Sequence, residues 1–235
     1  MVAWRKHSAV LGVLAGRIVV VAAGGTVAGH PRMREDPSRG RDSSQDSGLL
    51  MARVDVLVDG YARDDGTGST VSLVRSGAVV AVVDPGMVAR RSDILDPLRA
   101  LGVAADAVTD VVLSHHHPDH TINVALFPEA RVHDHWAIYD RDQWNDRPAE
   151  GFALAEDIVL WETPGHTPQD ISTVVTTDGG IVVLSHLWWH AAMVDDPRAT
   201  DLDLLHHNRA RVLEVATRIV PGHGPQFDVT DYVPR

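Results

Sequence analysis

Four histidines and an aspartate lie between residues 115 and 120, directly after the apolar run 111–113. The pattern is His-x-His-x-Asp-His, formed by His115, His117, Asp119 and His120. Neutral imidazole nitrogens and carboxylate oxygens are ligands that Zn²⁺ and Fe²⁺ accept. Alternate side chains of an extended segment share a face, so we expect His115 and His117 to reach one ion while His116 points away. This segment predicts a metal site.

Two further histidines occur in a shared context. His166 and His223 each follow Pro-Gly, and each Pro-Gly follows an apolar run that predicts a strand. A glycine beside a ligand allows the backbone to approach the ion closely. We therefore expect both histidines to join the first cluster as metal ligands.

The elements that must position these residues alternate along the chain. Apolar patterns predict strands at residues 54–58, 70–75, 78–83, 108–113, 130–133, 158–162, 171–176, 181–184 and 218–220. Helices are predicted at 92–101 and 201–217, and a short one opens at Asp119. Residues 60–68 and 135–149 are expected to form loops. Each of the three histidine segments directly follows a predicted strand.

Composition excludes several kinds of chemistry. The chain has 235 residues, of which 44% are hydrophobic and 23% charged, so it can bury a substantial core. It has no cysteine, which excludes disulfides, thiolate ligands and a cysteine nucleophile. Neither a Gly-x-Ser-x-Gly elbow nor a Gly-rich phosphate loop with Lys-Ser/Thr is present, which argues against acyl-enzyme and phosphate-loop chemistry.

Charge is distributed unevenly. The formal net charge is −11, and residues 1–50 hold seven Lys or Arg against four Asp or Glu. Residues 51–235 therefore carry 14 positive and 28 negative side chains, a net charge of −14. Such a surface repels polyanions. We therefore expect a small-molecule substrate and disfavour nucleic acid. The charge does not decide the oligomeric state, and a homodimer is compatible with it.

Residues 1–50 differ from the rest of the chain. A basic start, an apolar stretch at 9–16 and small residues near Ala23 resemble an export signal, but Arg17 interrupts the apolar stretch. No uninterrupted run is long enough to span a membrane. Residues 30–48 are expected to be disordered. The alternative is that the protein starts at Met51. We expect an N-terminal extension over residues 1–50 and one domain over residues 51–235. We expect the protein to be cytoplasmic unless residues 1–23 are a true export signal.

Residues 114–120, 163–167 and 221–225 resemble the successive metal motifs of the metallo-β-lactamase superfamily, and residues 83–86 match its early strand-end aspartate. The resemblance runs from about residue 54 to 227. The Pro-Gly-His-Gly-Pro ending and the opening strand are most similar to the group called metallo-β-lactamase domain-containing protein 1. The resemblance implies an α/β (α+β) fold, the four-layer αβ/βα sandwich, with metals at one edge.

The resemblance also implies roles for individual residues. His115, His117 and His166 would bind the first metal, and Asp119, His120 and His223 the second. Asp84 would hold a metal-bound histidine, and Asp119 would orient the reacting water or accept its proton as the catalytic residue. The implied cofactor is Zn²⁺, one or two ions, with Fe²⁺ or Mn²⁺ as alternatives.

One position departs from the family pattern. The superfamily normally places a bridging aspartate where this chain has His186. An imidazole cannot bridge two ions about 3.5–4 Å apart as a carboxylate does. We therefore expect a tightly bound first metal and a weaker second one. His190, Asp195 and Asp196 remain open as compensating ligands, although a loop role for His190 and a helix-surface role for His206 and His207 are favoured.

The expected function is a metal-dependent hydrolase in which a metal-bound hydroxide attacks an ester-like, lactone, thioester or phosphodiester bond. One alternative is a phosphodiesterase or ribonuclease, as in the resembling group. A second is a metal-binding protein whose catalysis is impaired by the change at His186. Four tryptophans either line an apolar pocket or pack in the core: Trp136, Trp144, Trp188 and Trp189.

Overall fold

The computed structural model describes residues 12–14, 17–19 and 51–235. Strand β1 (Gly12–Leu14) pairs antiparallel with β2 (Arg17–Val19). The export signal considered as an alternative for residues 1–23 falls largely outside the described residues, and the disorder expected at 30–48 does so entirely. Every predicted site residue lies within residues 51–235.

The first sheet has seven strands in the order β11-β10-β9-β8-β7-β6-β3. Their bounds are β3 Arg53–Val58, β6 Val71–Ser76, β7 Val79–Val83, β8 Asp110–Val112, β9 Arg131–His133, β10 Ala137–Asp140 and β11 Gln143–Asp146. Strands β7, β8 and β9 are parallel to one another and the other pairs are antiparallel. Helix α1 (Ser92–Ala100) lies on the crossover from β7 to β8, and α2 (Pro118–Thr121) on the crossover from β8 to β9.

The second sheet has six strands in the order β12-β13-β14-β15-β16-β17. Their bounds are β12 Ala153–Ala155, β13 Ile158–Glu162, β14 Ile171–Thr177, β15 Gly180–Ser185, β16 Arg218–Pro221 and β17 Phe227–Asp228. Only β15 and β16 pair in parallel, and the crossover between them carries α3 (Leu202–Leu213). Asp201 caps α3 by accepting a hydrogen bond from the Leu204 backbone N–H.

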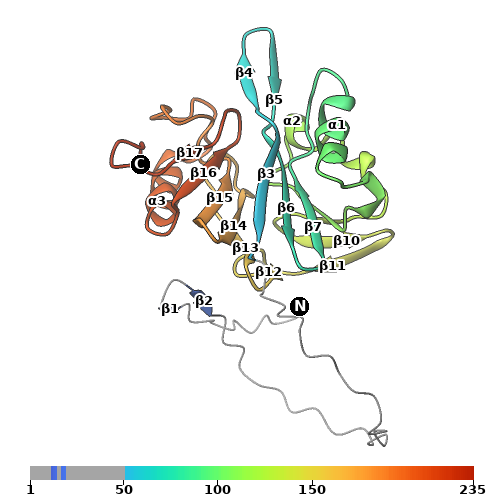
Figure 1. The fold of residues 1–235 in the computed structure, drawn as a ribbon. Coiled ribbons are helices and arrows are strands. Elements are labelled where there is room, and N and C mark those ends of the chain that lie inside the picture. Colours follow the sequence, from blue (N-terminus) through green and yellow to red (C-terminus); the bar gives the residue numbers. More distant parts are fainter. Residues whose placement is uncertain (1–11, 15–16, 20–50) are drawn as a thin grey trace, which may run out of the picture. The chain divides into compact units, whose positions relative to one another are not determined.

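The two sheets face each other across the main core, with helices outside. Val74 and Val112 of the first sheet pack with Leu160 and Leu184 of the second. On the first sheet, the neighbouring residues Leu73 and Val111 point to the opposite face, where they pack with α1. Helix α3 lies beside the second sheet (Figure 1), and it packs so closely on the turn after β13 that a Cβ atom on Gly165 would lie 2.6 Å from Cα of Leu205. Figure 1 shows α1 and α3 on opposite outer sides. The expected αβ/βα sandwich is therefore confirmed.

Two segments expected to be loops are hairpins instead. In residues 60–68, β4 (Tyr61–Arg63) pairs with β5 (Gly66–Gly68). In residues 135–149, β10 pairs with β11, and the rings of Tyr139 and Trp144 meet across the strands at 4.7 Å. Both hairpins are rich in polar residues, and nearly all of their strand residues are half-buried or exposed, so their sequences lack the apolar alternation of a strand that packs on a core. Cross-strand aromatic contacts stabilise the second hairpin instead.

Parallel pairing decides where the chemistry-bearing residues lie. The carboxyl ends of parallel strands meet at one edge of a sheet, so Asp84 after β7 lies near Ser114 and His115, which follow β8. In the second sheet, His186 after β15 lies near His223 after β16 for the same reason.

In the described part of the chain, no helix has the length and hydrophobicity needed to cross a membrane.

Candidate metal centre

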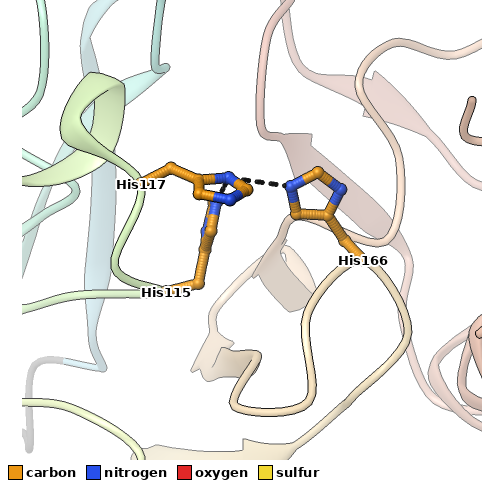
Figure 2. A group of neighbouring side chains, drawn as sticks. All are labelled: His115, His117 and His166. Atoms are coloured by element: carbon orange, nitrogen blue, oxygen red, sulfur yellow. Dashed lines mark hydrogen bonds between the residues drawn. The ribbon is translucent and has the colours of Figure 1, made fainter. Parts of the chain in front are cut away.

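Three histidine nitrogens from two sheets converge at the edge of the sandwich. Nε2 of His115 lies 2.9 Å from Nδ1 of His117, which lies 3.1 Å from Nε2 of His166 (Figure 2). In a tetrahedral zinc site with Zn–N bonds of about 2.0–2.1 Å, ligand nitrogens are roughly 3.3 Å apart. These three residues also form one of the groups able to hold an ion. We call them the first group.

The outer nitrogens of these rings fix the tautomers. Nδ1 of His166 lies 2.7 Å from the Asp196 carboxylate, which can only accept a hydrogen bond, so this nitrogen carries the proton. Nδ1 of His115 lies 3.0 Å from the Ser114 hydroxyl, whose own proton is donated to Asp84 at 2.7 Å. In both rings the Nε2 lone pair therefore points inward, as a metal ligand requires.

A second group consists of Asp119, His120 and His223. Oδ2 of Asp119 lies 3.6 Å from Nε2 of each histidine. Nδ1 of His120 donates to Asp84 at 2.8 Å, and Nδ1 of His223 donates to the Gly68 carbonyl at 3.0 Å. The buried Nε2 of His120 has no hydrogen-bond partner among the described residues. Such an unpaired atom costs about 1–3 kcal/mol, which a bound cation offsets. The donor set therefore fits a metal.

Asp84 supports both groups from behind, since it contacts His120 of the second group directly and reaches His115 of the first group through Ser114. Its carboxylate accepts the Ser114 backbone N–H at 2.7 Å and the Ser114 hydroxyl at 2.7 Å, besides the His120 ring. Its backbone has a positive φ of 51°, which is uncommon for a residue other than glycine. The strained turn after β7 thus aims one buried carboxylate at both His120 and the serine that supports His115.

His186 lies between the two groups. It is 2% exposed, and its Nε2 lies 3.1 Å from Nε2 of His223. Its ring centroid is 4.1 Å from that of His166 and 4.5 Å from that of His115. Its Nδ1 is buried and has no hydrogen-bond partner in residues 51–235 or the two short described strands. His186 therefore stands near both candidate ions with only one nitrogen in polar contact.

Burial keeps these histidines neutral. Desolvation, reinforced by neighbouring histidines, holds the pKa of His115 and of His186 well below the usual value. Burial also lowers the pKa of His117, and lowers that of His223 to about 4. At neutral pH, protons therefore do not compete with a metal for these four lone pairs.

Other polar residues singled out in the sequence lie elsewhere. His116 bonds Asp134 at 3.0 Å, away from both groups. His190 is exposed, and His206 pairs with the exposed Asp195 at 3.1 Å. Asp196 touches the outer nitrogen of His166, so it does not stand between the two ions. Its contact could not be predicted from the sequence, because the loop between β15 and α3 has no regular spacing.

That loop is held by a buried arginine. Arg209 of α3 is fully buried and donates to the backbone carbonyls of Leu187, at 2.8 Å, and of Val194. Its guanidinium also lies over the Trp188 ring, 5.3 Å from the centroid. These bonds position Trp189, whose indole N–H donates to Asp196 at 3.0 Å. Sequence inspection did not single out Arg209, because a charged helix residue normally faces solvent.

The metal groups open into a cleft of about 440 Å³. Its walls include His117, Asp119, His166, Trp189, His223, Arg63 and Arg198. Trp188 instead packs fully buried in the core, and Trp136 and Trp144 are exposed near or on the β10–β11 hairpin. Of the two expected roles, Trp189 therefore has the pocket role and Trp188 the core role, whereas Trp136 and Trp144 have neither.

Comparison with known proteins agrees with this architecture. The family model of the metallo-beta-lactamase superfamily matches residues 64–229. Metallo-beta-lactamase domain-containing protein 1 of Xenopus laevis is 34% identical, over 75% of this chain and 81% of that protein. Its Mus musculus counterpart is 31% identical, over 92% and 89% of the two chains.

Solved structures share the fold at low identity. A metallo-beta-lactamase structure from Thermotoga maritima has a TM-score of 0.63 and 19% identity, covering 76% of this chain and all of that one. A dizinc quorum-quenching lactonase, solved with its product, has a TM-score of 0.51 and 19% identity over 71% and 79%. A protein in a di-iron-bound form has a TM-score of 0.54 and 20% identity over 73% and 94%. The chain belongs to the metallo-beta-lactamase superfamily, in the group of metallo-beta-lactamase domain-containing protein 1.

Proposed function

We propose that the protein is a metal-dependent hydrolase that cleaves an ester-like bond, a lactone or thioester, in a small substrate bearing an anionic group. The observation that carries this proposal is the convergence of three histidine nitrogens, those of His115, His117 and His166, beside an open cleft. When bound, a Zn²⁺, Fe²⁺ or Mn²⁺ ion supplies Lewis acidity, which polarises a carbonyl and makes water more acidic.

The chain's own residues divide the remaining work. The histidines of the first group hold the ion, and Asp196 and Ser114 keep their rings in the binding tautomer. Asp119 lines the cleft with a carboxylate that is 18% exposed. It accepts a proton as water attacks the carbonyl carbon, and it returns that proton to the departing alkoxide or thiolate.

The cleft walls support a small anionic substrate. Arg63 and Arg198 both line the cleft, and neither pairs with a carboxylate of the described residues, whereas most other arginines of the domain do. Trp189 adds an apolar wall. Two guanidinium groups suit a carboxylate or phosphate on the substrate. The quorum-quenching lactonase shares only the fold, so it supports the reaction class more than the substrate.

A phosphodiesterase or ribonuclease activity is the second candidate. It is favoured by the second metal group, because two ions can clamp the attacking and leaving oxygens of a phosphoryl transfer. It is disfavoured by the net charge of −14 on residues 51–235, since a long polyanion needs a basic track. We therefore rank it below ester-like cleavage.

The test is a substrate panel on metal-depleted and reloaded protein. Zn²⁺, Fe²⁺ and Mn²⁺ forms are assayed with an N-acyl homoserine lactone, an acyl thioester, a β-lactam and an activated phosphodiester. The expected result is metal-dependent turnover of the lactone or thioester, with His117→Ala at background. Fast turnover of the phosphodiester alone would favour the second candidate. A metal-loaded protein that turns over none of the four would indicate a binding protein with impaired catalysis.

A further inference from the structure

Strands of both sheets place a hydroxyl side chain in the apolar layer between the sheets. On β6, Ser72 stands two positions before the core residue Val74. On β14, Thr173 stands between the core residues Ile171 and Val175. Because alternate residues of a strand share a face, both hydroxyl side chains point into the core. They are 1% and 2% exposed, so each needs a polar partner inside the protein.

Ser72 and Thr173 line one small cavity between the sheets. Its volume is about 10 Å³, and every residue that lines it is buried. Asp84 and Ser114 line it as well, and the other walls are largely apolar. A single buried water needs roughly 10–15 Å³ and two to four polar partners. The cavity therefore has the size and the polar lining that suit one water molecule.

The Ser72 hydroxyl is the observation that points to a ligand. Its Oγ atom is buried and has no hydrogen-bond partner among the described residues. The Ser114 hydroxyl in the same cavity is already committed, because it donates to Asp84 at 2.7 Å. A buried hydroxyl without a partner destabilises the folded state, and an internal water is the usual remedy.

The Asp84 carboxylate has capacity for a further donor. Its Oδ2 atom contacts the Ser114 hydroxyl at 2.7 Å and Nδ1 of His120 at 2.8 Å. Its Oδ1 atom accepts the Ser114 backbone N–H at 2.7 Å. A carboxylate offers about four lone-pair sites, so Oδ1 can accept one more hydrogen bond.

We infer that this cavity binds one internal water molecule, which bonds the hydroxyls of Ser72 and Thr173 and donates to Oδ1 of Asp84. Three partners are typical of a buried water. The water joins the two sheets and connects the carboxylate behind His120 to the second sheet. This site is separate from the cleft and holds whether or not the protein is a hydrolase.

The experiment counts long-lived internal waters in the zinc-loaded full chain by ¹⁷O magnetic relaxation dispersion. Ser72→Val fills the cavity and removes the hydroxyl, so it should lose one such water relative to wild type. Ser172→Ala is the matched control, because Ser172 is buried beside Thr173 but does not line the cavity, and its hydroxyl bonds Thr163 and Ser185. The control should keep the wild-type count.

The unfolding temperature of the same proteins gives a second readout with a definite sign. Displacing an ordered water with an apolar group loses its hydrogen bonds, so Ser72→Val should unfold about 2–4 °C below wild type. In a dry cavity, the same change would remove an unpaired hydroxyl and fill a void, and the unfolding temperature would rise. An unchanged water count in Ser72→Val, or a raised unfolding temperature, would overturn the inference.

If Ser72→Val does not fold, a pair of milder variants tests the same water. Ser72→Ala and Thr173→Val each remove one hydroxyl, and each should lower the unfolding temperature. Because both hydroxyls bond the same water, the double variant should lose less than the sum of the two single shifts. Fully additive shifts would show that the two side chains have separate partners, which contradicts a shared water.

Discussion

Asp196 Oδ2 lies 2.7 Å from Nδ1 of His166, on the side of the ring that faces away from His117. The two residues are 30 positions apart in the chain. The same carboxylate accepts the Trp189 indole N–H at 3.0 Å and, through its other oxygen, the Arg198 backbone N–H at 2.8 Å. A carboxylate behind a metal-binding histidine fixes its tautomer and raises its basicity. Asp196 thus links the first metal group to the loop that carries three cleft residues, Trp189, Pro197 and Arg198.

Replacing this carboxylate should weaken the first site. Asp196→Asn keeps the size of the side chain but removes its charge, so affinity for the first ion should fall by about 10-fold. Asp195→Asn is the matched control, because Asp195 is exposed and, within the described part of the chain, pairs with His206 alone. Chelator competition measures the affinity, and ¹⁵N NMR of the histidines reports the His166 tautomer. Equal affinity in both variants would mean that Asp196 only holds the loop.

The sequence located the candidate ligands because their spacing is local. His115, His117, Asp119 and His120 lie within one strand end and one short helix, and His166 and His223 share the Pro-Gly-His context. Alternating apolar residues also predicted most strands of both sheets correctly, because one or both faces of those strands are buried. Pattern and packing agree wherever a strand contributes to the core.

The parts that the sequence missed depend on tertiary contacts. The β10–β11 hairpin is polar and stabilised by the Tyr139–Trp144 contact, which no alternation reveals. The direction of His186 depends on the space that Gly222 leaves, and the position of Asp196 on the buried bonds of Arg209. Such contacts join residues far apart in the chain, so local pattern carries no signal for them.

The domain prediction can be tested by truncation. The candidate metal groups of the described residues and both large sheets lie in residues 51–235. A protein starting at Met51 should unfold at the same temperature as the full chain and bind the same amount of metal. Differential scanning fluorimetry and elemental analysis give both quantities. A truncated protein that fails to fold, or that loses metal, would place the boundary elsewhere.

Asp170 makes stability depend on pH. Burial raises its pKa to about 6, although Thr167 donates to it from its backbone N–H at 2.7 Å and its hydroxyl at 2.5 Å. The pKa of Asp170 is therefore higher in the folded state than in the unfolded state, where it is about 4. The contribution of this group to the free energy of unfolding is fully present below about pH 4. The contribution is lost as pH rises through 6.

The variant Asp170→Asn removes that titration and keeps an acceptor for Thr167. Between pH 4 and pH 7, wild type should lose stability relative to this variant by about 3 kcal/mol, the equivalent of roughly two pKa units. Urea unfolding of metal-free protein at several pH values measures the difference. A difference in unfolding free energy that does not change with pH would show that Asp170 is ionised throughout.

The cleft arginines should select for charge on the substrate. Arg63→Gln and Arg198→Gln should each raise KM for an ester that carries a carboxylate by about 10-fold, because a hydrogen bond to a charged group is worth about 1.5–3 kcal/mol. KM for a neutral ester of the same leaving group should not change. Arg141→Gln is the control, since Arg141 is exposed outside the cleft near Glu129. Equal effects on both esters would exclude charge recognition.

Metal content and turnover measured together on His115→Ala and His116→Ala test the central claim most directly. The two histidines are neighbours, but His115 is buried among the converging nitrogens and His116 bonds Asp134 outside them. We predict that His115→Ala loses the first ion and hydrolysis of the lactone and thioester together, and that His116→Ala keeps both. Equal metal loss in the two variants, or turnover that persists in His115→Ala, would contradict a hydrolase built on the first group.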